Sequence, residues 1–574
     1  MLCYVQPQCS RASVAPLEPS FRPAAFIHQD TRLALLLVAS FLLLSSPLSC
    51  DMRAAQAQPK TQPKAQPATQ TPLRPNDISE QRKLQLASYQ AVLQLIDAYY
   101  LEERNVAGLL DSVINAVLSR LDPHSYYQTP DATSSATAYY KGEGYRYGFA
   151  YDFYHGRPVI QRVTPGSPAS DAGLLPGDNV DVIWGQPVET LKEAEADAMF
   201  LSGPTLEMIV TRNGGRKRVH AKLELRQVHD RSVEIAEMLD KITAYIYLSG
   251  FIASTYYEMK RALEDLTAAG MKKLILDLRG NGGGLFDEGK FVASLFLPFH
   301  TKLVGTRGRG DTSVLFDSTY VPGRFTDVEL VILVDEGTAS AAEIVAGVLQ
   351  DHDRALVIGE QTFGKGLLQR RFDLPDGGSF ALTMGHYYLP SGRCIQRKYV
   401  GNEFVEQRKP LPLGNNRGHV KDTLLPYDGR FVTSANRTVY GGQGIVPEII
   451  VINDTAHAVI VELWEQQAFD RFTDTILNLN AEKLAPQYKD AADFVKRYQA
   501  KAEMLPLFTK IARQQGVKDA GTKIESHRAE VLHELKRWLC YRLFPNNGWE
   551  RSALAQDKQF DEAVKLLKEQ LVVK

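Results

Sequence analysis

The spacing of apolar residues divides the chain into helical and strand-rich stretches. Between Tyr89 and Leu121, apolar side chains recur at intervals of three and four residues, which places them on one face of a helix. The pattern predicts two amphipathic helices, and Asp122-Pro123 is expected to end the second, because proline cannot continue a helix. We therefore assign residues 81–143 to an N-terminal helical region.

A different pattern begins near residue 144. Short runs rich in β-branched residues, such as Val159–Val163 and Leu206–Val210, are separated by glycines and predict strands joined by turns. Between these runs, the sequence VTPGSPASDAGLLPGDNVDVIWG predicts a short helix, a turn and a further strand. Residues 144–226 are therefore expected to form a small β-rich module.

Strands and helices alternate in the next part of the chain. The runs AYIYL, KKLILDL, VELVILVD and ALVIG are strongly apolar and typical of buried strands, and helical patterns separate them. Such alternation predicts an α/β sheet with parallel strands. We assign residues 227–452 to this α/β core. The charged, helical pattern that follows predicts a C-terminal helical region, residues 453–574.

The first 80 residues carry signals for export rather than for a folded core. Leu33–Leu44 is an apolar run of 12 residues, which is short for a membrane span but typical of a signal peptide. Cys50 lies in a poor lipoprotein box and is a candidate lipid anchor, and a small-x-small cleavage motif ends at Ala57. The Pro- and Gln-rich stretch Gln56–Pro75 cannot bury a core and predicts a linker. We interpret residues 1–80 as a signal or anchor segment with a linker, and expect an exported protein, periplasmic or on the extracytoplasmic face of the membrane.

Composition argues against several classes of function. The formal net charge of −1 over 574 residues offers no basic surface for nucleic acid. Five cysteines without short paired spacings favour neither a zinc ribbon nor a disulfide framework, and the sequence has no HExxH metal motif. We therefore expect no metal, no cofactor and no nucleic-acid partner. The state of Cys394 and Cys540 and the oligomeric state stay open.

The stretch GEQTFGKGLLQ, Gly359–Gln369, is close to a phosphate-binding loop but lacks two of its features. Such a loop needs a Ser or Thr after its lysine to bind magnesium, and here Gly366 follows Lys365. It must also open a helix, whose N-terminus supplies donors to the phosphates. The residues after Lys365 alternate and run into a Pro-Asp-Gly turn, which predicts a strand and a hairpin instead. Nucleotide binding is therefore disfavoured, and Lys365 is either an ordinary surface lysine or part of other chemistry.

Two further loops follow strands of the predicted sheet. Ser340 lies between a strand and a helix, and Ser340 with Glu343 fits a capping box. The same position suits a nucleophile, because the first free N–H groups of the helix point toward a developing oxyanion. The stretch DLRGNGGGLFDEG places Gly282–Gly284 after another strand, where the backbone can approach a ligand. Neighbouring strand ends thus carry a serine, a lysine and a glycine turn. This arrangement is compatible with a Ser–Lys pair, in which the lysine is desolvated and neutral and acts as the base.

These three stretches, in this order, resemble the motifs of the C-terminal processing, or tail-specific, serine proteases. DLRGNGGG is similar to that family's DLRGNPGG, EGTASAAEIVAGVLQD to its GSASASEI–AGALQD signature, and GEQTFGKGLLQ to its GEKTFGKGxVQ. Gly282 stands where the family has proline, and Thr338 and Ala342 replace serines. Lys365 lies 25 positions after Ser340, which is the spacing of the family.

The resemblance implies a role for each matching residue. Ser340 would be the nucleophile, Lys365 the general base and Gln369 the residue that orients the lysine. The backbone N–H groups of Ala341 and Gly284 would stabilise the oxyanion. Gln369 is four residues beyond Lys365 on a predicted strand and is therefore expected on the same face.

The likeness extends over roughly residues 85–452. The segment LDPHSYYQTP follows the N-terminal helices, as in the family. Residues 144–226 resemble its PDZ domain, in which Tyr147, Gly148 and Phe149 would bind the terminal carboxylate of a substrate. The family also implies a crotonase-like fold for the α/β core, with the PDZ domain inserted before it and helical regions on either side.

The sequence thus predicts an exported serine endopeptidase that cleaves proteins near their C-termini. Its partners would be proteins or peptides with free C-termini, and a membrane tether is an option. Two alternatives remain. A non-catalytic PDZ scaffold on an inactive protease fold is disfavoured by the intact serine, lysine and glutamine. A serine hydrolase that uses His352 or His386 as its base would not need Lys365.

Overall fold

Residues 75–569 are described by a computed structural model, apart from positions 103–105, 155, 201, 401–402, 405–428, 454–456 and 546. The described residues fall into two compact units, one within residues 75–114 and the other within residues 115–569. The predicted signal segment Leu33–Leu44 and the candidate lipid anchor Cys50 lie outside the described residues. Within the described residues, none of the helices has both the length and the apolar character needed to span a bilayer.

The smaller unit contains α1 (Pro75–Tyr99) and most of α2 (Val106–Leu118). Both helices were predicted from the three- and four-residue spacing. The first begins several residues earlier than expected, at a proline, which is favoured in the first turn of a helix because its missing N–H has no partner there. Apolar side chains on α1 are exposed, namely Leu84, Leu86, Val92 and Leu95.

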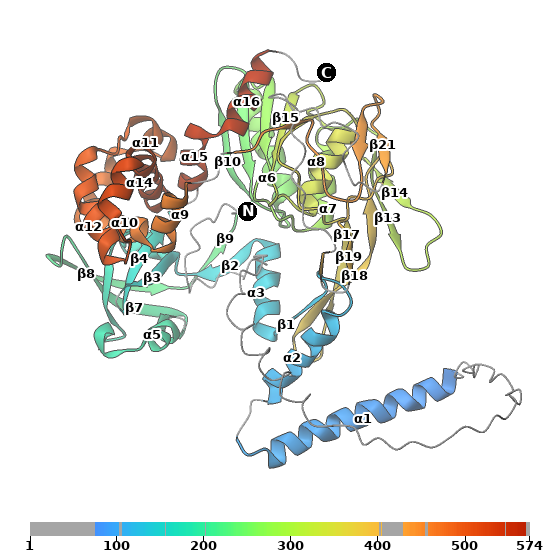
Figure 1. Ribbon diagram of the computed structural model, residues 1–574, viewed down its shortest axis with the longest axis horizontal. Coiled ribbons are helices and arrows are strands. Elements are labelled where there is room, and N and C mark those ends of the chain that lie inside the picture. The colour runs from blue at the N-terminus through green and yellow to red at the C-terminus, as the bar shows by residue number, and fades with distance from the viewer. Residues whose placement is uncertain are drawn as a thin grey trace, which may run out of the picture. The chain divides into compact units, whose positions relative to one another are not determined.

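A six-stranded sheet forms the centre of the larger unit (Figure 1). Its strands, in spatial order, are β10 (Val233–Met238), β11 (Thr243–Leu248), β12 (Lys273–Asp277), β15 (Glu329–Val334), β16 (Leu356–Gly359) and β23 (Ile449–Ile450). All neighbours pair in parallel except β10, which is antiparallel to β11. The parallel strands are continuous apolar runs because helices cover both faces of the sheet. The predicted parallel α/β sheet is confirmed.

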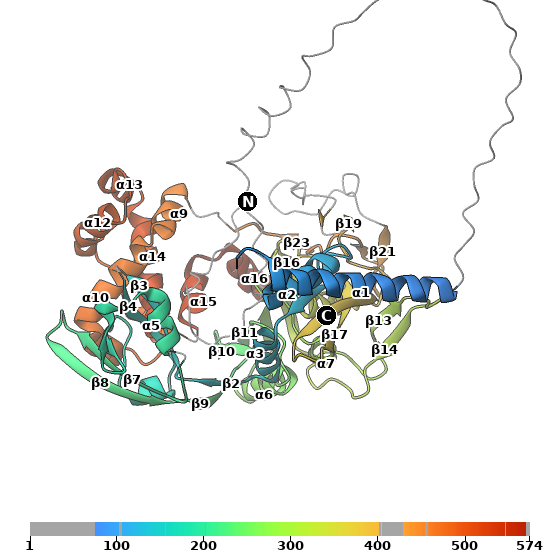
Figure 2. The same cartoon turned by 90° about the horizontal axis from the view of Figure 1, so that it is seen from below.

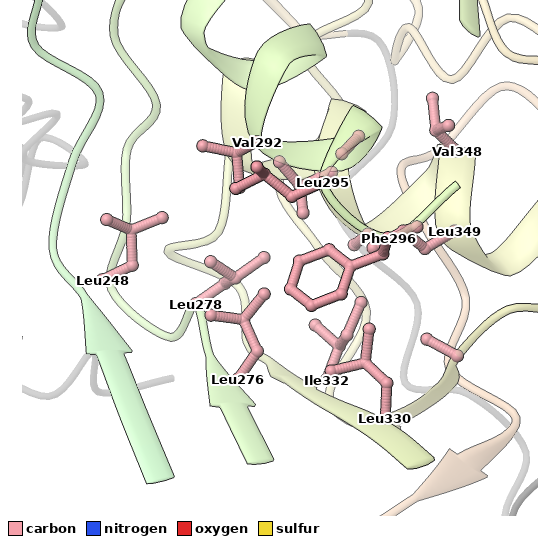
Figure 3. Close-up of a cluster of buried hydrophobic side chains, with 14 of the residues drawn as sticks. Leu248, Leu276, Leu278, Val292, Leu295, Phe296, Leu330, Ile332, Val348 and Leu349 are labelled. Atoms are coloured by element: carbon pink, nitrogen blue, oxygen red, sulfur yellow. The ribbon is translucent and has the colours of Figure 1, made fainter. Parts of the chain in front are cut away.

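Three helices pack on one face of this sheet: α6 (Thr255–Ala268), α7 (Phe286–Ser294) and α8 (Ala341–Asp351). Between them and the strands lies the largest hydrophobic core, in which Leu276, Phe296 and Ile332 are completely buried (Figure 3). This core fixes the start of α8 relative to the ends of β12 and β15, from which the candidate loops emerge.

The last helix of the chain, α16 (Lys558–Lys568), covers the opposite face of the same sheet. Its Leu566 and Leu567 pack with Ile275 and Val331, whose side chains alternate with those that face the first core. Just before this helix, Asp557 forms an ion pair of 2.6 Å with Arg279 at the end of β12. The region after residue 453 is thus helical as predicted, but its final helix belongs to the core of the α/β sheet.

A second, antiparallel sheet lies beside the first. Its strands are β1 (Tyr126–Gln128), β13 (Lys302–Gly308), β14 (Leu315–Ser318), β17 (Leu367–Asp373) and β18 (Ser379–Tyr388). The hairpin of β17 and β18 confirms the strand and turn predicted after Lys365. The nearby short elements are α3 (Pro130–Lys141), β19 (Tyr399–Val400), β20 (Glu403–Phe404), β21 (Arg430–Val432) and β22 (Thr438–Tyr440).

The β-rich module predicted for residues 144–226 is a separate sheet with its own core. It contains β3 (Phe149–Tyr154), β4 (Arg157–Val163), α4 (Pro168–Asp171), β5 (Asn179–Ile183), β6 (Gln186–Pro187), α5 (Glu193–Phe200), β7 (Thr205–Arg212) and β8 (Lys217–Glu224). The chain enters through β2 (Glu143–Arg146) and leaves through β9 (Arg226–His229), and these two strands pair with each other. The paired connections show that the module is a single insertion.

A group of helices contacts this module (Figure 2). These are α9 (Ala458–Glu465), α10 (Ala468–Leu484), α11 (Ala491–Arg497), α12 (Leu505–Gln514), α13 (Ala520–Ser526), α14 (Arg528–Leu543) and α15 (Gly548–Ala553). The Asn478 amide on α10 donates to the carbonyls of Gly177 (2.8 Å) and Thr211 (3.1 Å) and accepts from the Gly214 N–H (2.9 Å). These buried hydrogen bonds attach the helices to the turns of the β-rich module.

Candidate active site

Ser340 occupies a sharp turn between β15 and α8. Its φ of 55° and ψ of −116° are unfavourable for a residue with a side chain. Other hydrolases hold a nucleophilic serine on a strained strand-to-helix turn that presents its hydroxyl group. The N–H of Ala341, at the first position of α8, donates to no acceptor within the described residues. Ser340 therefore lies beside a free backbone donor, as the sequence predicted.

The glycine turn after β12 lies directly against this serine. A Cβ atom on Gly283 would be 2.7 Å from the Ser340 Cβ and 2.9 Å from the Ala341 nitrogen. The buried Asn281 shapes the turn: its amide nitrogen donates to the Leu248 carbonyl (2.8 Å), and its side-chain oxygen accepts from the Gly283 N–H (2.9 Å). The backbone of Gly283 has a positive φ of 95°, which residues with a side chain rarely adopt. Glycine is therefore required at this position.

Of Gly283, which lies against the serine, and the next residue, Gly284, only Gly284 has a free N–H within the described residues. The Gly283 N–H is used by Asn281, whereas the Gly284 N–H donates to no acceptor in the described part of the chain. A parallel bridge between Gly284 and Phe251 holds this part of the turn. The geometry is thus compatible with the predicted oxyanion role of Gly284 and adds Asn281, which sequence reasoning did not single out.

Lys365 is held by Gln369. The Lys365 Nζ donates to the Gln369 Oε1 at 2.6 Å, and the Gln369 Nε2 donates to the His124 carbonyl. Burial lowers the pKa of Lys365 to about 8, although the carboxylates of Glu343 and Asp122 act in the opposite direction. The structure therefore brings together the predicted lysine and glutamine, and it desolvates the lysine.

The contact between Lys365 and Gln369 forms at the start of β17. Lys365 lies just before this strand and Gln369 lies within it. The predicted pair is therefore hydrogen-bonded, although Lys365 itself is not part of the regular strand.

A cluster of aromatic rings includes Phe363, from the lysine loop, and His124, whose charge state is influenced by Lys365. The ring centroids of His124, Phe363 and Phe404 lie 5.8 to 6.3 Å from one another. Burial and the neighbouring Lys365 charge lower the pKa of His124 to about 4, so its imidazole is neutral at physiological pH. Lys365 therefore has an uncharged imidazole as a neighbour, and this role of His124 could not be inferred from its distant place in the sequence.

The loop of the serine and the loop of the lysine are joined by Glu343. Its carboxylate accepts hydrogen bonds from the backbone N–H groups of Ser340 (2.9 Å) and Lys365 (2.9 Å). Sequence reasoning identified Glu343 only as a capping residue of α8. Within the described residues, no hydrogen bond joins the Lys365 Nζ to the Ser340 hydroxyl, so the two groups share supports rather than a direct contact.

The alternative bases lie elsewhere. His352 is at the far end of α8, whose 11 residues span about 16 Å. Its Nε2 contacts the Lys302 carbonyl at 2.6 Å. His386 is exposed on β18, opposite Leu367. Neither histidine is hydrogen-bonded to Ser340. Among the described residues, no three His, Cys, Asp or Glu side chains gather as a metal site, and Cys540 is a buried free thiol.

The residues predicted to bind a substrate carboxylate lie at the start of β3. The Tyr147 hydroxyl donates to the Gly203 (2.6 Å) and Thr205 (2.8 Å) carbonyls. Gly148 has a φ of 84°, and a Cβ atom there would overlap Ser167. Phe149 is 8% exposed and packs against neighbouring aromatic rings. The structure thus places the three residues in one turn of the β-rich module, with the Phe149 side chain in its core.

Comparison with known proteins identifies relatives of the chain. Residues 242–405 match the model of peptidase family S41. The chain is 32% identical over 358 residues to a carboxy-terminal-processing protease of Bartonella bacilliformis, covering 59% of this chain and 81% of that protein. It is 40% identical over 248 residues to a carboxyl-terminal-processing protease of Synechocystis, covering 42% and 57%. It is 25% identical to a solved photosystem II D1 C-terminal processing protease, with a TM-score of 0.31, covering 57% and 94%.

The chain therefore belongs to peptidase family S41 and is a serine-type peptidase. The family resemblance predicted from the three motifs is confirmed.

The glycine turn provides a test with an internal control. Gly283→Ala should lower peptide cleavage by about 100-fold or more, because a Cβ atom there collides with the backbone around Ser340. Gly282→Ala should retain activity within about twofold, since its Cβ would have no heavy atom within 4 Å. Cleavage rates of both variants, with circular dichroism to verify folding, measure the difference. Equal activity of the two folded variants would contradict the proximity of Gly283 to the serine.

Proposed function

We propose that this peptidase is an endopeptidase that cleaves protein tails with a Ser340–Lys365 dyad. The observation that carries the proposal is the setting of Lys365. The lysine is desolvated by burial, is held by Gln369 and shares the Glu343 carboxylate with the serine loop. A lysine with a lowered pKa is what a general base at neutral to mildly alkaline pH requires.

The reaction follows from this arrangement. Deprotonated Lys365 accepts the proton of the Ser340 hydroxyl, and the serine oxygen attacks the scissile carbonyl carbon. The Gln369 Oε1 accepts one of the two remaining lysine N–H groups and so directs the nitrogen lone pair. The N–H groups of Ala341 and Gly284 stabilise the oxyanion. Lys365 then gives its proton to the leaving amine, and water hydrolyses the acyl-enzyme by the same steps.

The β-rich module supplies a means of tail recognition, and we assign it as a PDZ domain inserted before a crotonase-like core. Its β3 is an edge strand, so an extended peptide can pair with it. Helix α5 lies beside β3, since the Tyr151 hydroxyl on β3 donates to Asp197 on α5 at 2.8 Å. The N–H groups of Tyr147 and Gly148 donate to no acceptor within the described residues and could receive a terminal carboxylate. The names of the relatives, as carboxy-terminal-processing proteases, support tails as the substrate.

We also propose that the protein acts outside the cytoplasm. The support is the apolar run Leu33–Leu44 followed by the Pro- and Gln-rich linker. Mass spectrometry of the native N-terminus tests this proposal: cleavage near Ala57 or a lipid on Cys50 supports it, and an intact Met1 on a cytoplasmic protein contradicts it.

Replacement of either dyad residue tests the proposed function directly. Ser340→Ala and Lys365→Ala should each lower kcat by at least about 1,000-fold, and the double variant should be no worse, because the groups act as one unit. Ser294→Ala and Lys272→Ala, on the surface of the same core, serve as controls with normal rates. Normal turnover by folded Lys365→Ala would assign the base to another residue.

The pH dependence of cleavage reports the charge of the lysine. Lys365 is a base only when deprotonated, so kcat/KM should rise with pH and level off above the lysine pKa of about 8. At pH 6 the rate should be roughly 100-fold below the plateau, because only about 1% of the lysine is neutral two pH units below its pKa. Initial rates between pH 6 and 10 measure the profile. A midpoint below 6.5 would indicate a histidine base instead.

Tail recognition predicts a dependence on the free carboxylate of the substrate. Amidation of the C-terminus, or a terminal Asp, should lower kcat/KM by about tenfold or more, since a charge-assisted hydrogen bond is lost or a second negative charge is introduced. Peptides that differ only at this end, compared at equal concentration, make the measurement. Deletion of residues 144–226 should remove the preference, whether the remaining rate falls or rises. Equal rates for free, amidated and Asp-ended tails would leave the module as a spacer.

A further inference from the structure

Glu343 is a buried carboxylate whose hydrogen bonds come from two different loops. The side chain is 0% exposed. Its Oε2 accepts from the N–H groups of Ser340 and Lys365, both at 2.9 Å. Its Oε1 accepts from the Gly364 N–H at 2.7 Å and from the Thr362 hydroxyl at 2.5 Å. One donor therefore belongs to the serine turn and three belong to the lysine loop.

The donors identify the group as an ionised carboxylate. Each carboxylate oxygen accepts two hydrogen bonds, so all four acceptor positions are used. A protonated carboxyl would direct its own hydrogen at an N–H or O–H donor. Burial raises the pKa of Glu343, whereas these hydrogen bonds and the first turn of α8, which favours negative charge, act in the opposite direction. The four donors therefore match the ionised form of the carboxylate, even though burial raises its pKa.

We propose that Glu343 is the positioning residue of this site, which sets the spacing between the serine turn and the lysine loop so that nucleophile and base meet. The inference rests on the proposed Ser–Lys function. Ser340 and Lys365 follow different strands and have no direct hydrogen bond with each other. The Oε2 atom accepts hydrogen bonds from the backbone N–H groups of both residues, so a shift of the carboxylate is expected to move both.

The charge of Glu343 has a second effect, on the protonation of Lys365. The negative charge opposes the effect of burial and keeps the lysine pKa from falling further. The other charged or titratable groups that face Lys365 are Asp122 and His124, from the segment before β1, and Arg397, which acts on the same histidine. Asp122 acts in the same direction as Glu343, so removal of the Glu343 charge alone lowers the lysine pKa without abolishing its titration.

Two substitutions separate position from charge. Glu343→Gln removes the charge and turns an NH2 group toward two of the donors. Glu343→Asp keeps the charge but withdraws the carboxylate by about 1.5 Å, the length of one methylene. Glu448→Gln is the control: Glu448 is a half-buried carboxylate of the same core that accepts from the Val357 N–H and the Gln350 amide, both at 2.9 Å.

The experiment measures kcat and KM on a peptide substrate and, independently, the rate at which acetic anhydride modifies Lys365 as a function of pH, by mass spectrometry. Both Glu343 variants should lose about 100-fold in kcat with little change in KM, because misplacement of about 1 Å costs that much. The titration midpoint of Lys365 should fall in Glu343→Gln and stay near the wild-type value in Glu343→Asp. The control should change neither quantity.

The outcomes are distinct. A kcat within twofold of wild type in folded Glu343→Asp, together with an unchanged lysine midpoint in Glu343→Gln, overturns the proposal. If Glu343→Gln does not fold, the kcat of Glu343→Asp decides: a large loss supports the positioning role and a normal value refutes it. A wild-type protein that cleaves no peptide refutes the proposed function instead, while the modification rates still test the link between Glu343 and the lysine.

Discussion

The site depends on the parallel direction of neighbouring strands. Parallel strands end at the same edge of a sheet, so the loops that follow β11, β12, β15 and β16 emerge side by side. These loops supply the Phe251 bridge, the glycine turn, the serine and the lysine in turn. Sequence distance is therefore irrelevant to their proximity. The helices on either face hold the strands in place, and the positions of the strand ends in turn fix where the loops begin.

Much of this arrangement was predictable, because the strands are continuous apolar runs and the loops carry distinctive residues. Most of the roles that could not be predicted belong to groups that form hydrogen bonds with residues far away in the sequence. Glu343 has a sufficient local explanation as a capping residue, which conceals its bonds to the lysine loop. The His124 carbonyl receives Gln369 from a segment 245 positions away. The Gly283 N–H is bound by the side chain of Asn281, a residue that the motif comparison had given no role.

The β-rich module is attached to the rest of the protein in two ways, covalently at its two ends and non-covalently through the C-terminal helices. Paired strands β2 and β9 connect the module to the core covalently. Its turns, by contrast, are bound by polar contacts from α10, among them an ion pair between Arg212 and Glu482 and the buried amide of Asn478. Polar contacts of this kind have strict geometry, because an unmatched buried donor or acceptor is costly. The orientation of the module is thus specified more sharply than a hydrophobic contact of similar size would allow.

The place of α16 in the core has a consequence for folding kinetics. One face of the central sheet is covered by this helix, and Asp557 reaches the strand end that leads into the glycine turn. Lys273 on β12 donates a hydrogen bond to the Leu567 carbonyl, 294 positions further along the chain. Contacts between residues so far apart in sequence slow folding, because a long loop must close before they form. This face of the sheet is therefore expected to be covered late in folding, after the face that α6, α7 and α8 cover.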